Sequence, residues 1–381
     1  MSTQNFKVIV SHPARQGFVY QVPLAIQQQG IPVKFLTGLY YKPDQFPYSL
    51  VKYLPLSRRA TVVRQLEKRQ LPGLKPESVI SIGGPWLEMI FRPLALHNMW
   101  QEAHDWLVSQ WIARLPPLDK PTLLHCFDGS AKRTLMAAKR KGITTIYEIT
   151  VPALATFEIE TEERRRLGLS ENGYYSERKW AAHLLEEYQT ADYLVAQSRV
   201  TVEHLLQMGI TPKQIILLPL GVDTNHFRPT PIKNNNRVFR CLFVGQLGIR
   251  KGLHYLLAAW KQLDLPNAEL ILAGGIGGID RRKFGIELLD KYKGSYSWSG
   301  FVPQQQLPEI YQGADIFALP SLSEGASMAM QEAMASGLPC IVSTNVGCIL
   351  RDGVEGYVTP VGDVELLKDR IRQLYFNPEL R

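Results

Sequence analysis

Short apolar segments alternate with amphipathic segments along the whole chain. The runs KVIVSH at 7–12, PTLLHCF at 121–127 and TTIYEI at 144–149 have the length and the branched or aromatic residues of buried strands. Between them, runs such as SAKRTLMAAKRKG at 130–142 have helical spacing and end at a glycine. This alternation predicts parallel sheets covered by helices on both faces.

A polar stretch interrupts the alternation at about residues 221–236. It contains prolines and three consecutive asparagines, which are typical of a connector. The pattern then restarts with the predicted strand RCLFVGQ at 240–246. We therefore predict two doubly wound α/β domains, residues 1–220 and 237–381, that face each other. Ligands of such sheets bind beyond the carboxyl ends of the strands, so the strand-to-helix turns are the places to search.

The composition is ordinary for a soluble globular protein, with 45 % hydrophobic and 20 % charged residues. No apolar run approaches the roughly 20 residues of a membrane helix. The N-terminal stretch lacks the basic region of a signal peptide and is predicted as a strand. Four cysteines without a CxxC spacing argue against a disulfide scaffold or a zinc site. We therefore expect a cytoplasmic protein.

The net charge of +8 favours anionic partners. Nucleic acid is not expected as a partner, because the basic residues are dispersed and are not interleaved with aromatic ones. The basic stretch SRRATVVRQLEKR at 57–69 would suit docking to an anionic membrane face. Ordinary solubility is the simpler explanation of the same charge.

The segment FVGQLGIRKG at 243–252 places two cations, Arg250 and Lys251, directly before a predicted helix. Free N–H groups at a helix start favour anions, so this turn is a candidate diphosphate clamp. It is not a Walker A loop, because GxxxxGK[ST] is absent, and the glycines of LILAGGIGG do not match GxGxxG. A surface basic pair beside a turn is the alternative interpretation.

Two glutamates, Glu324 and Glu332, flank the start of a predicted helix in SEGASMAMQEAMASG. Ser327 is a suitable N-cap for a helix at 328–335, and Gly337 a suitable stop. A carboxylate accepts hydrogen bonds from vicinal hydroxyls, and the helix start between the two acids suits a phosphate. The arrangement predicts a ligand with hydroxyls at both ends and phosphates in the middle. From the spacing alone, a loop charge and a solvated helix residue are the simpler interpretation.

The combination of motifs from Gly300 to Leu367 is more specific than each motif alone. It contains Glu–seven residues–Glu, then EAMA, a Gly-Leu-Pro turn and DGxEG. It resembles the donor-binding domain of retaining GT-B glycosyltransferases of family 4, the glycosyl transferases group 1. VGQLGIRKG, ADYLVAQS and PLGVDTNHFRP extend the resemblance over most of residues 190–375, whereas the likeness of residues 1–190 is weaker. The resemblance implies a GT-B fold, two Rossmann-like domains facing across a cleft.

The resemblance also implies roles for particular residues. Glu324 would contact the transferred sugar, and Lys251 with Arg250 would neutralise the diphosphate leaving group. Glu332 would hold the ribose hydroxyls. The further donor-binding residues implied are Gly325, Ala326, Ser327, Gly17, Val302 and Gln246.

Three features depart from the family's pattern. Gln246 stands where an arginine often follows Val-Gly, and Arg250 is available to compensate. Many family members have a His-Asp pair in the N-terminal domain, and here the acceptor-side candidates are Glu148 and His125 instead. For His125, a histidine at a strand end that hydrogen-bonds to backbone is an equally good interpretation. The chain ends at LYFNPELR, where relatives usually continue into a final helix; a naturally short chain and a truncated one both stay open.

We expect a retaining hexosyltransferase that moves a sugar from a UDP- or GDP-linked donor to a hydroxyl acceptor in glycan, glycolipid or polysaccharide biosynthesis. No cofactor is implied and, without a DxD motif, no metal. The acceptor stays open among glycans, lipid-linked sugars and small molecules. The alternative is a non-catalytic nucleotide-sugar-binding subunit or degenerate homologue. A hydrolase is disfavoured, because its two acids must face one anomeric carbon.

Overall fold

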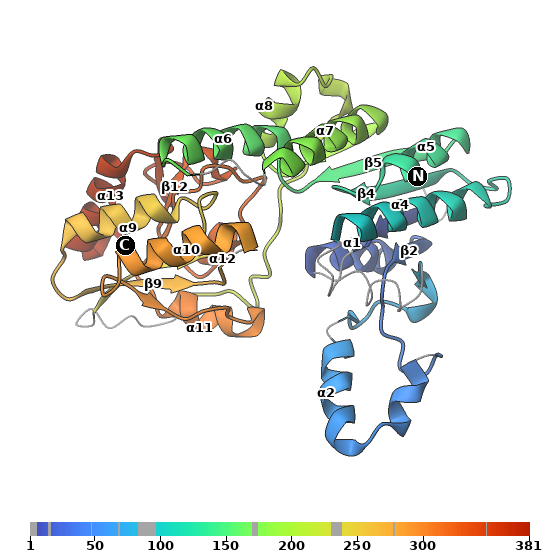
Figure 1. Ribbon diagram of the computed structural model, residues 1–381, viewed down its shortest axis with the longest axis horizontal. Helices are drawn as coiled ribbons and strands as arrows, with labels where there is room; N and C mark the ends of the chain where they lie inside the picture. Colours follow the sequence, from blue (N-terminus) through green and yellow to red (C-terminus); the bar gives the residue numbers. More distant parts are fainter. Residues whose placement is uncertain are drawn as a thin grey trace. The chain divides into compact units, whose positions relative to one another are not determined.

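The computed structural model describes residues 6–13, 17–46, 48–67, 69–82, 97–169, 174–229, 238–276, 279–347 and 349–381 (Figure 1). The chain forms two compact units that interleave in sequence. The first comprises Met1–Ile149, Ala182–Val195 and Lys213–Ile216, and the second comprises Thr150–Ala181, Ala196–Pro212 and Leu217–Arg381. The predicted linker lies partly outside the described residues, which omit 230–237.

The described strands of the first unit form a seven-stranded sheet in the order β3-β2-β1-β4-β5-β6-β7. The pairs from β3 through β5 are parallel, as the alternation of strands and helices predicted. The order reverses beside β1, which has β2 on one side and β4 on the other, so this is the switch point of the sheet. The strands are β1 (Lys7–His12), β2 (Val33–Thr37), β3 (Val79–Ser81), β4 (Thr122–Phe127), β5 (Thr144–Ile149), β6 (Tyr193–Ala196) and β7 (Ile215–Leu217).

In the described part of the second unit, six strands form a sheet in the order β10-β9-β8-β11-β12-β13, and each neighbouring pair is parallel. The central strand β11 is fully apolar and buried along its whole length, because helices cover both faces. Its switch point lies between β8 and β11. The strands are β8 (Phe239–Val244), β9 (Ala268–Ala273), β10 (Ser297–Trp298), β11 (Ile316–Leu319), β12 (Cys340–Ser343) and β13 (Gly356–Thr359).

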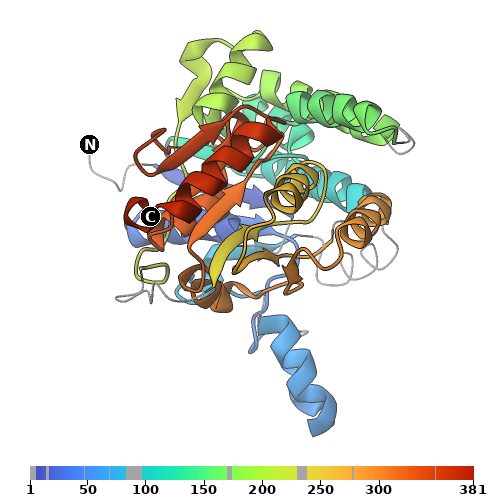
Figure 2. The same ribbon diagram turned by 90° about the vertical axis from the view of Figure 1, so that its left-hand side faces the viewer.

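Most of the described helices connect successive strands, and the last two follow β13 (Figure 1, Figure 2). None of those described is long and apolar enough to cross a membrane. Before β8 the helices are α1 (Gly17–Gln28), η1 (Tyr48–Tyr53), α2 (Leu56–Glu67), η2 (Pro76–Ser78), α4 (His97–Ala113), α5 (Lys132–Arg140), α6 (Ala153–Arg166), α7 (Tyr174–Thr190), α8 (Arg199–Gln207) and η3 (Pro212–Gln214). After β8 they are α9 (Leu253–Leu263), α10 (Ile279–Lys291), η4 (Gln304–Gln306), α11 (Leu307–Gln312), α12 (Met328–Ala335), η5 (Thr344–Val346), α13 (Val364–Phe376) and η6 (Pro378–Leu380).

Helix α12 has the bounds and caps that its sequence predicted. The Ser327 hydroxyl accepts a hydrogen bond from the Met330 N–H, 3.3 Å away. After the C-cap, Gly337 adopts a left-handed backbone conformation with φ of 76°, which ends the helix. The loop that carries Glu324 therefore leads directly into a fixed helix start.

The start of α5 is capped by an acid from a distant helix. Glu187, fully buried on α7, accepts hydrogen bonds from the N–H groups of Gly129, Ala131 and Lys132, at 3.1, 2.7 and 2.9 Å. The Tyr147 hydroxyl also donates to this carboxylate. The N-cap position itself is an alanine, so the cap comes from tertiary structure, and it holds the turn that follows β4.

Candidate functional site

The turns after β8 and β11 lie next to each other, because these two strands are neighbours in the sheet. The Leu322 N–H donates a hydrogen bond to the Arg250 carbonyl oxygen, at 2.8 Å. Gly252 adopts a left-handed conformation with φ of 64°, and a methyl group there would overlap the Pro320 carbonyl. The backbone contacts of these turns therefore place the residues that each turn carries side by side.

Arg250, Lys251 and Glu324 form one ionic cluster at this edge of the sheet. Glu324 Oε1 lies 2.8 Å from Arg250 Nη1 and 2.7 Å from Lys251 Nζ. The Ser321 hydroxyl donates to the same oxygen at 3.0 Å, and Arg250 Nη1 also donates to the Ser323 carbonyl at 3.1 Å. The structure thus brings together the three residues that the sequence predicted as catalytic.

The cluster is buried, so its charges interact strongly. Burial would raise the pKa of Glu324, but Lys251 and Arg250 outweigh it and hold that pKa below its usual value. Burial lowers the pKa of Lys251, the charge of Arg250 lowers it further, and Glu324 opposes both. Glu324 is therefore a carboxylate that two cations share, and an incoming anion would compete with it for them.

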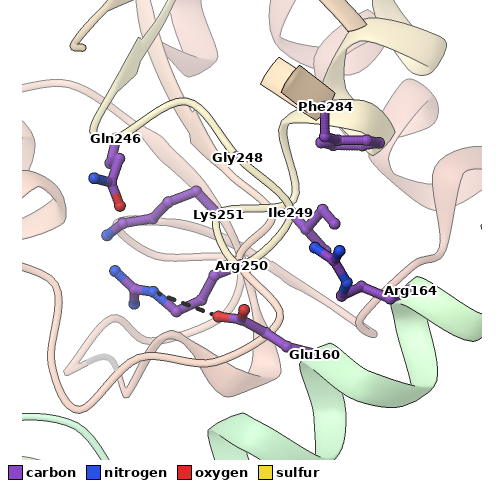
Figure 3. Close-up of a pocket in the computed structure, with 8 residues that line it drawn as sticks. All are labelled: Glu160, Arg164, Gln246, Gly248, Ile249, Arg250, Lys251 and Phe284. Carbon is purple, nitrogen blue, oxygen red and sulfur yellow. Dashed lines mark ion pairs between the residues drawn. The ribbon is translucent and has the colours of Figure 1, made fainter. Parts of the chain in front are cut away.

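A small pocket borders the cluster (Figure 3). Gln246, Arg250 and Lys251 extend to one side of the turn, whereas Ile249, Arg164 and Phe284 lie on the other side. The Glu160 side chain reaches toward Arg250. The pocket is lined by Glu160, Arg164, Gln246, Gly248, Ile249, Arg250, Lys251 and Phe284. Two of these, Glu160 and Arg164, come from α6.

Helix α6 was not singled out from the sequence, yet it supports this site within the second unit. Its Thr156 hydroxyl lies 2.7 Å from the Ser323 hydroxyl, and Glu160 Oε1 lies 3.9 Å from Arg250 Nε. The sequence did contain a signal for this role: Thr156, Glu160 and Glu163 are spaced by four and three residues. That spacing places their side chains on one face of a helix.

The C-terminal half of α6 is bound to α9 through Glu163. Its carboxylate lies 2.8 Å from His254 Nε2 and accepts two hydrogen bonds from Arg166, at 2.7 and 3.0 Å. Burial would raise the pKa of Glu163, but hydrogen bonds from His254 and Arg166 outweigh it and lower the pKa to about 2. The carboxylate is therefore ionised at neutral pH and holds α6 against α9.

Glu332 lies on α12, buried, with a partner that the sequence did not reveal. The Tyr311 hydroxyl of α11 donates a hydrogen bond to Glu332 Oε2 at 2.8 Å. Burial raises the pKa of Glu332, although this hydrogen bond and the nearby His226 act in the opposite direction. Within the described part of the chain, this is the side-chain hydrogen bond that the Glu332 carboxylate accepts, and it uses Oε2. The other oxygen, Oε1, would suit a ligand with hydroxyl donors.

The small residues after Glu324 have a structural reason besides ligand access. A methyl group on Gly325 would overlap the carbonyl oxygen of Thr150, in the same unit. The Thr201 hydroxyl also donates to the Gly325 carbonyl, at 3.3 Å. Ala326 is half-buried, and Ser327 caps α12. Close backbone packing alone thus requires glycine at position 325.

The remaining donor-side predictions fall at separate places. Val302 is half-buried and packs on the core of the second unit, next to Phe301, which is 79 % exposed. Gln246 is exposed at the pocket. Gly17 begins α1 in the first unit, and residues 14–16 of its loop lie outside the described residues.

The two acceptor-side candidates, His125 and Glu148, contact each other in the first unit. They lie on the neighbouring strands β4 and β5, and His125 Nε2 is 2.9 Å from Glu148 Oε2. Both side chains are mostly buried. Within the described ranges, we find no group of three or more histidine, cysteine or acidic side chains arranged to hold a metal ion.

Residues 223–381 match the family model described as glycosyl transferases group 1. Among curated proteins, the putative colanic acid biosynthesis glycosyltransferase WcaL of Salmonella typhimurium is 28 % identical over 215 residues, 52 % of each chain. Mannosylfructose-phosphate synthase of Agrobacterium fabrum is 29 % identical over 210 residues, 50 % of this chain and 43 % of that protein. The chain thus spans about half the length of the curated relatives it matches.

Solved structures match nearly the whole chain. Sucrose-phosphate synthase from Thermosynechococcus elongatus superposes with a TM-score of 0.69 at 17 % identity, over 98 % of this chain and 90 % of that one. HepE from Anabaena, in complex with UDP-glucose, gives 0.59 at 16 % identity, over 98 % and 91 %. The fold is therefore GT-B, as predicted, and the predicted resemblance to the glycosyl transferases group 1 is confirmed over residues 223–381.

Proposed function

We propose that this chain, whose C-terminal part matches the glycosyl transferases group 1, transfers a sugar from a nucleoside diphosphate sugar to a hydroxyl acceptor. The observation that carries the proposal is the buried cluster at the ends of β8 and β11. There, two cations share one carboxylate at the switch point of a parallel sheet, where such folds bind ligands.

The cluster suits the diphosphate of a donor. Arg250 and Lys251 would exchange part of their contact with Glu324 for phosphate oxygens, with the start of α9 close by. Charge develops on the leaving diphosphate in the transition state, and fixed cations in a buried site stabilise it without reorganisation. Electrostatic stabilisation of the leaving group would thus be the main catalytic contribution, without a metal ion.

The two glutamates would bind the hydroxyl-bearing ends of the donor. Glu324 and the backbone amides of Gly325 to Ser327 would contact the sugar, and Glu332, oriented by Tyr311, would accept from the ribose hydroxyls. The backbone at Val302 would contact the base. Among the matching structures, HepE was solved with UDP-glucose and a trehalose-6-phosphate protein with UDP-2-fluoro glucose, which favours a UDP-hexose here.

We propose retention of anomeric configuration, with the acceptor attacking from the face that the diphosphate leaves. A donor phosphate oxygen would take the acceptor proton, so no enzyme nucleophile is required. His125 and Glu148 remain proposed acceptor-side residues. Matches to colanic acid and amylovoran glycosyltransferases favour a polysaccharide intermediate as acceptor, handled in the cytoplasm with peripheral contact to an anionic membrane.

Binding of nucleotides tests the proposal first. We expect UDP to raise the melting temperature of the wild type, since a ligand at about 100 times its Kd stabilises by about 2.7 kcal/mol. Glu332→Ala should lose most of this response, whereas Glu309→Ala, an exposed acid on α11, should keep it. GDP, ADP and CMP serve as competing ligands. No response to any nucleotide by a folded protein would refute the donor site.

Turnover separates the enzyme from a non-catalytic homologue. Incubation with radiolabelled UDP-hexose should release UDP slowly by hydrolysis, and faster with a suitable acceptor. Lys251→Ala should reduce this release by about a hundredfold, in the range found when one transition-state donor is removed. Tight UDP binding with no release of UDP from any hexose donor would favour the non-catalytic subunit instead.

A further inference from the structure

The first unit carries an arm, residues 42–67, that leaves the sheet region after Tyr41 and returns at Arg69. The Tyr41 N–H donates to the Arg69 carbonyl at 3.1 Å, which joins the two ends. The Tyr41 and Tyr48 rings meet edge to face with centroids 5.6 Å apart, and Leu66 packs beside them. The arm is thus anchored at its base, and α2 extends away from the sheet of its own unit (Figure 1, Figure 2).

Large apolar side chains of the arm point into solvent. Phe46 is 78 % exposed and Tyr53 is 74 % exposed, and between and beside them lie Leu50 at 51 % and Leu54 at 38 %. More than a third of each of these side chains stays in contact with water, although they occur together within residues 46–54. An exposed cluster of apolar side chains is typical of a surface that binds another protein or a membrane.

Basic side chains accompany the apolar ones. Lys52 Nζ lies 5.0 Å from the centre of the Tyr53 ring, and Arg58, Arg59 and Arg64 are exposed on α2. The arm, residues 42–67, contains five basic residues and two acids, Asp44 and Glu67. The partner must therefore offer an apolar region and negative charge side by side.

We propose that the arm binds the surface of a bilayer that contains anionic lipids. Phe46, Leu50, Tyr53 and Leu54 enter the boundary between headgroups and acyl chains, where aromatic side chains are favoured. The lysine and arginines pair with lipid phosphates, and each contributes roughly a fivefold increase in partitioning.

Charge favours a membrane over a second copy of the chain as the occupant. Two copies would bring equally basic arms together, and each chain carries a net charge of +8. Protein interfaces are also depleted in lysine at their cores, whereas this arm has Lys52 directly beside Tyr53. Binding to vesicles does not require catalysis. The inference rests on the proposed function in one respect: docking would bring the glycosyltransferase site to a lipid-linked acceptor.

Flotation with vesicles of defined composition tests the arm. The full-length protein should float with phosphatidylcholine vesicles that contain about a third phosphatidylglycerol, and much less with phosphatidylcholine alone. The double variant Phe46→Ser/Tyr53→Ser should bind at least about tenfold more weakly. Arg58→Glu/Arg59→Glu should lose at least about 25-fold.

Matched controls isolate the arm from general stickiness and charge. Phe376→Ser removes a side chain that is 65 % exposed in the second unit, and Arg114→Glu reverses an exposed charge outside the arm. Both should bind within about twofold of the wild type, and all variants should keep the wild-type melting temperature and UDP response.

Three results would overturn the proposal. The first is absence of binding to anionic vesicles, and the second is equal loss of binding in the controls. The third is light scattering that shows a dimer which the arm variants dissociate, since the arm would then be an interface between copies. Loss of binding in the charge variant alone would refute the insertion of apolar side chains and leave adsorption of a basic surface. A failure of UDP to bind would instead concern the proposed function.

Discussion

Replacing Glu324 with glutamine removes the carboxylate that Arg250 and Lys251 both contact, at 2.8 and 2.7 Å. The side chain keeps its size, so the change is mainly one of charge. Two mostly buried cations then lose their nearest counter-ion. We expect the ligand-free variant to be less stable than the wild type but to respond more strongly to a nucleoside diphosphate.

The size of the effect follows from the burial of the cluster. Removing one partner of a buried ion pair costs about 3–5 kcal/mol. The lower end applies here, because Arg250 is 21 % exposed and keeps Glu160 at 3.9 Å. At roughly 2–4 °C for each kcal/mol, a loss of about 3 kcal/mol lowers the melting temperature by roughly 6–12 °C.

The diphosphate should recover part of that loss. In the wild type, an incoming diphosphate competes with Glu324 for the two cations, whereas in the variant it meets cations without this competitor. The rise in melting temperature with saturating UDP should therefore be larger for Glu324→Gln than for the wild type. Differential scanning fluorimetry at pH 7, with and without UDP, measures both quantities on the same samples.

The control is Glu365→Gln, which breaks an exposed pair with Lys368. Glu365 is 76 % exposed, so the change should alter stability by at most about 0.5 kcal/mol and leave the UDP response intact. The reasoning is refuted if Glu324→Gln leaves the ligand-free stability unchanged, or if its UDP response is equal to or smaller than that of the wild type.

Two further predictions concern the supports of the site, and a third concerns the cap of α5 in the first unit. The pKa of Glu163 falls from 4.5 to about 2 on folding, so the stability it contributes is present above pH 4.5 and is lost as the pH falls toward 2. Glu163→Gln should cost roughly 1–2 kcal/mol at pH 7, after allowance for solvent screening, and urea titrations should show a flatter dependence on pH in that window. Gly325→Ala should cost about 1–3 kcal/mol because the methyl group overlaps Thr150, whereas Gly221→Ala, which meets no atom within 4 Å, should be nearly neutral by thermal denaturation. Glu187→Ala should cost about 3 kcal/mol, because two buried N–H groups, the half-buried Lys132 N–H and the buried Tyr147 hydroxyl lose their acceptor. Amides at the start of α5 should then exchange faster with deuterium.

Much of the local structure could be predicted from the sequence, because it depends on neighbouring residues. The alternation of strands and helices predicted both parallel sheets. The bounds of α12 followed from Ser327 and Gly337, since capping involves atoms a few bonds away along the chain. The meeting of Arg250, Lys251 and Glu324 was also predictable, although only through resemblance to a family whose motifs lie at the same turns.

Tertiary structure alone decided which distant residues complete these local features. Helix α6 ends at Arg166, far ahead of the start of α9 at Leu253, yet it packs in the second unit. Glu163 contacts His254 there, and Thr156 contacts Ser323. The hydrogen bond from Tyr311 to Glu332 and the cap that Glu187 provides for α5 have the same origin. Buried polar groups need hydrogen-bond partners, and the packing of distant elements decides which residue lies within about 3 Å. The period of hydrophobic residues determines which face of an element is buried, but the partner on the other side depends on how the elements pack together.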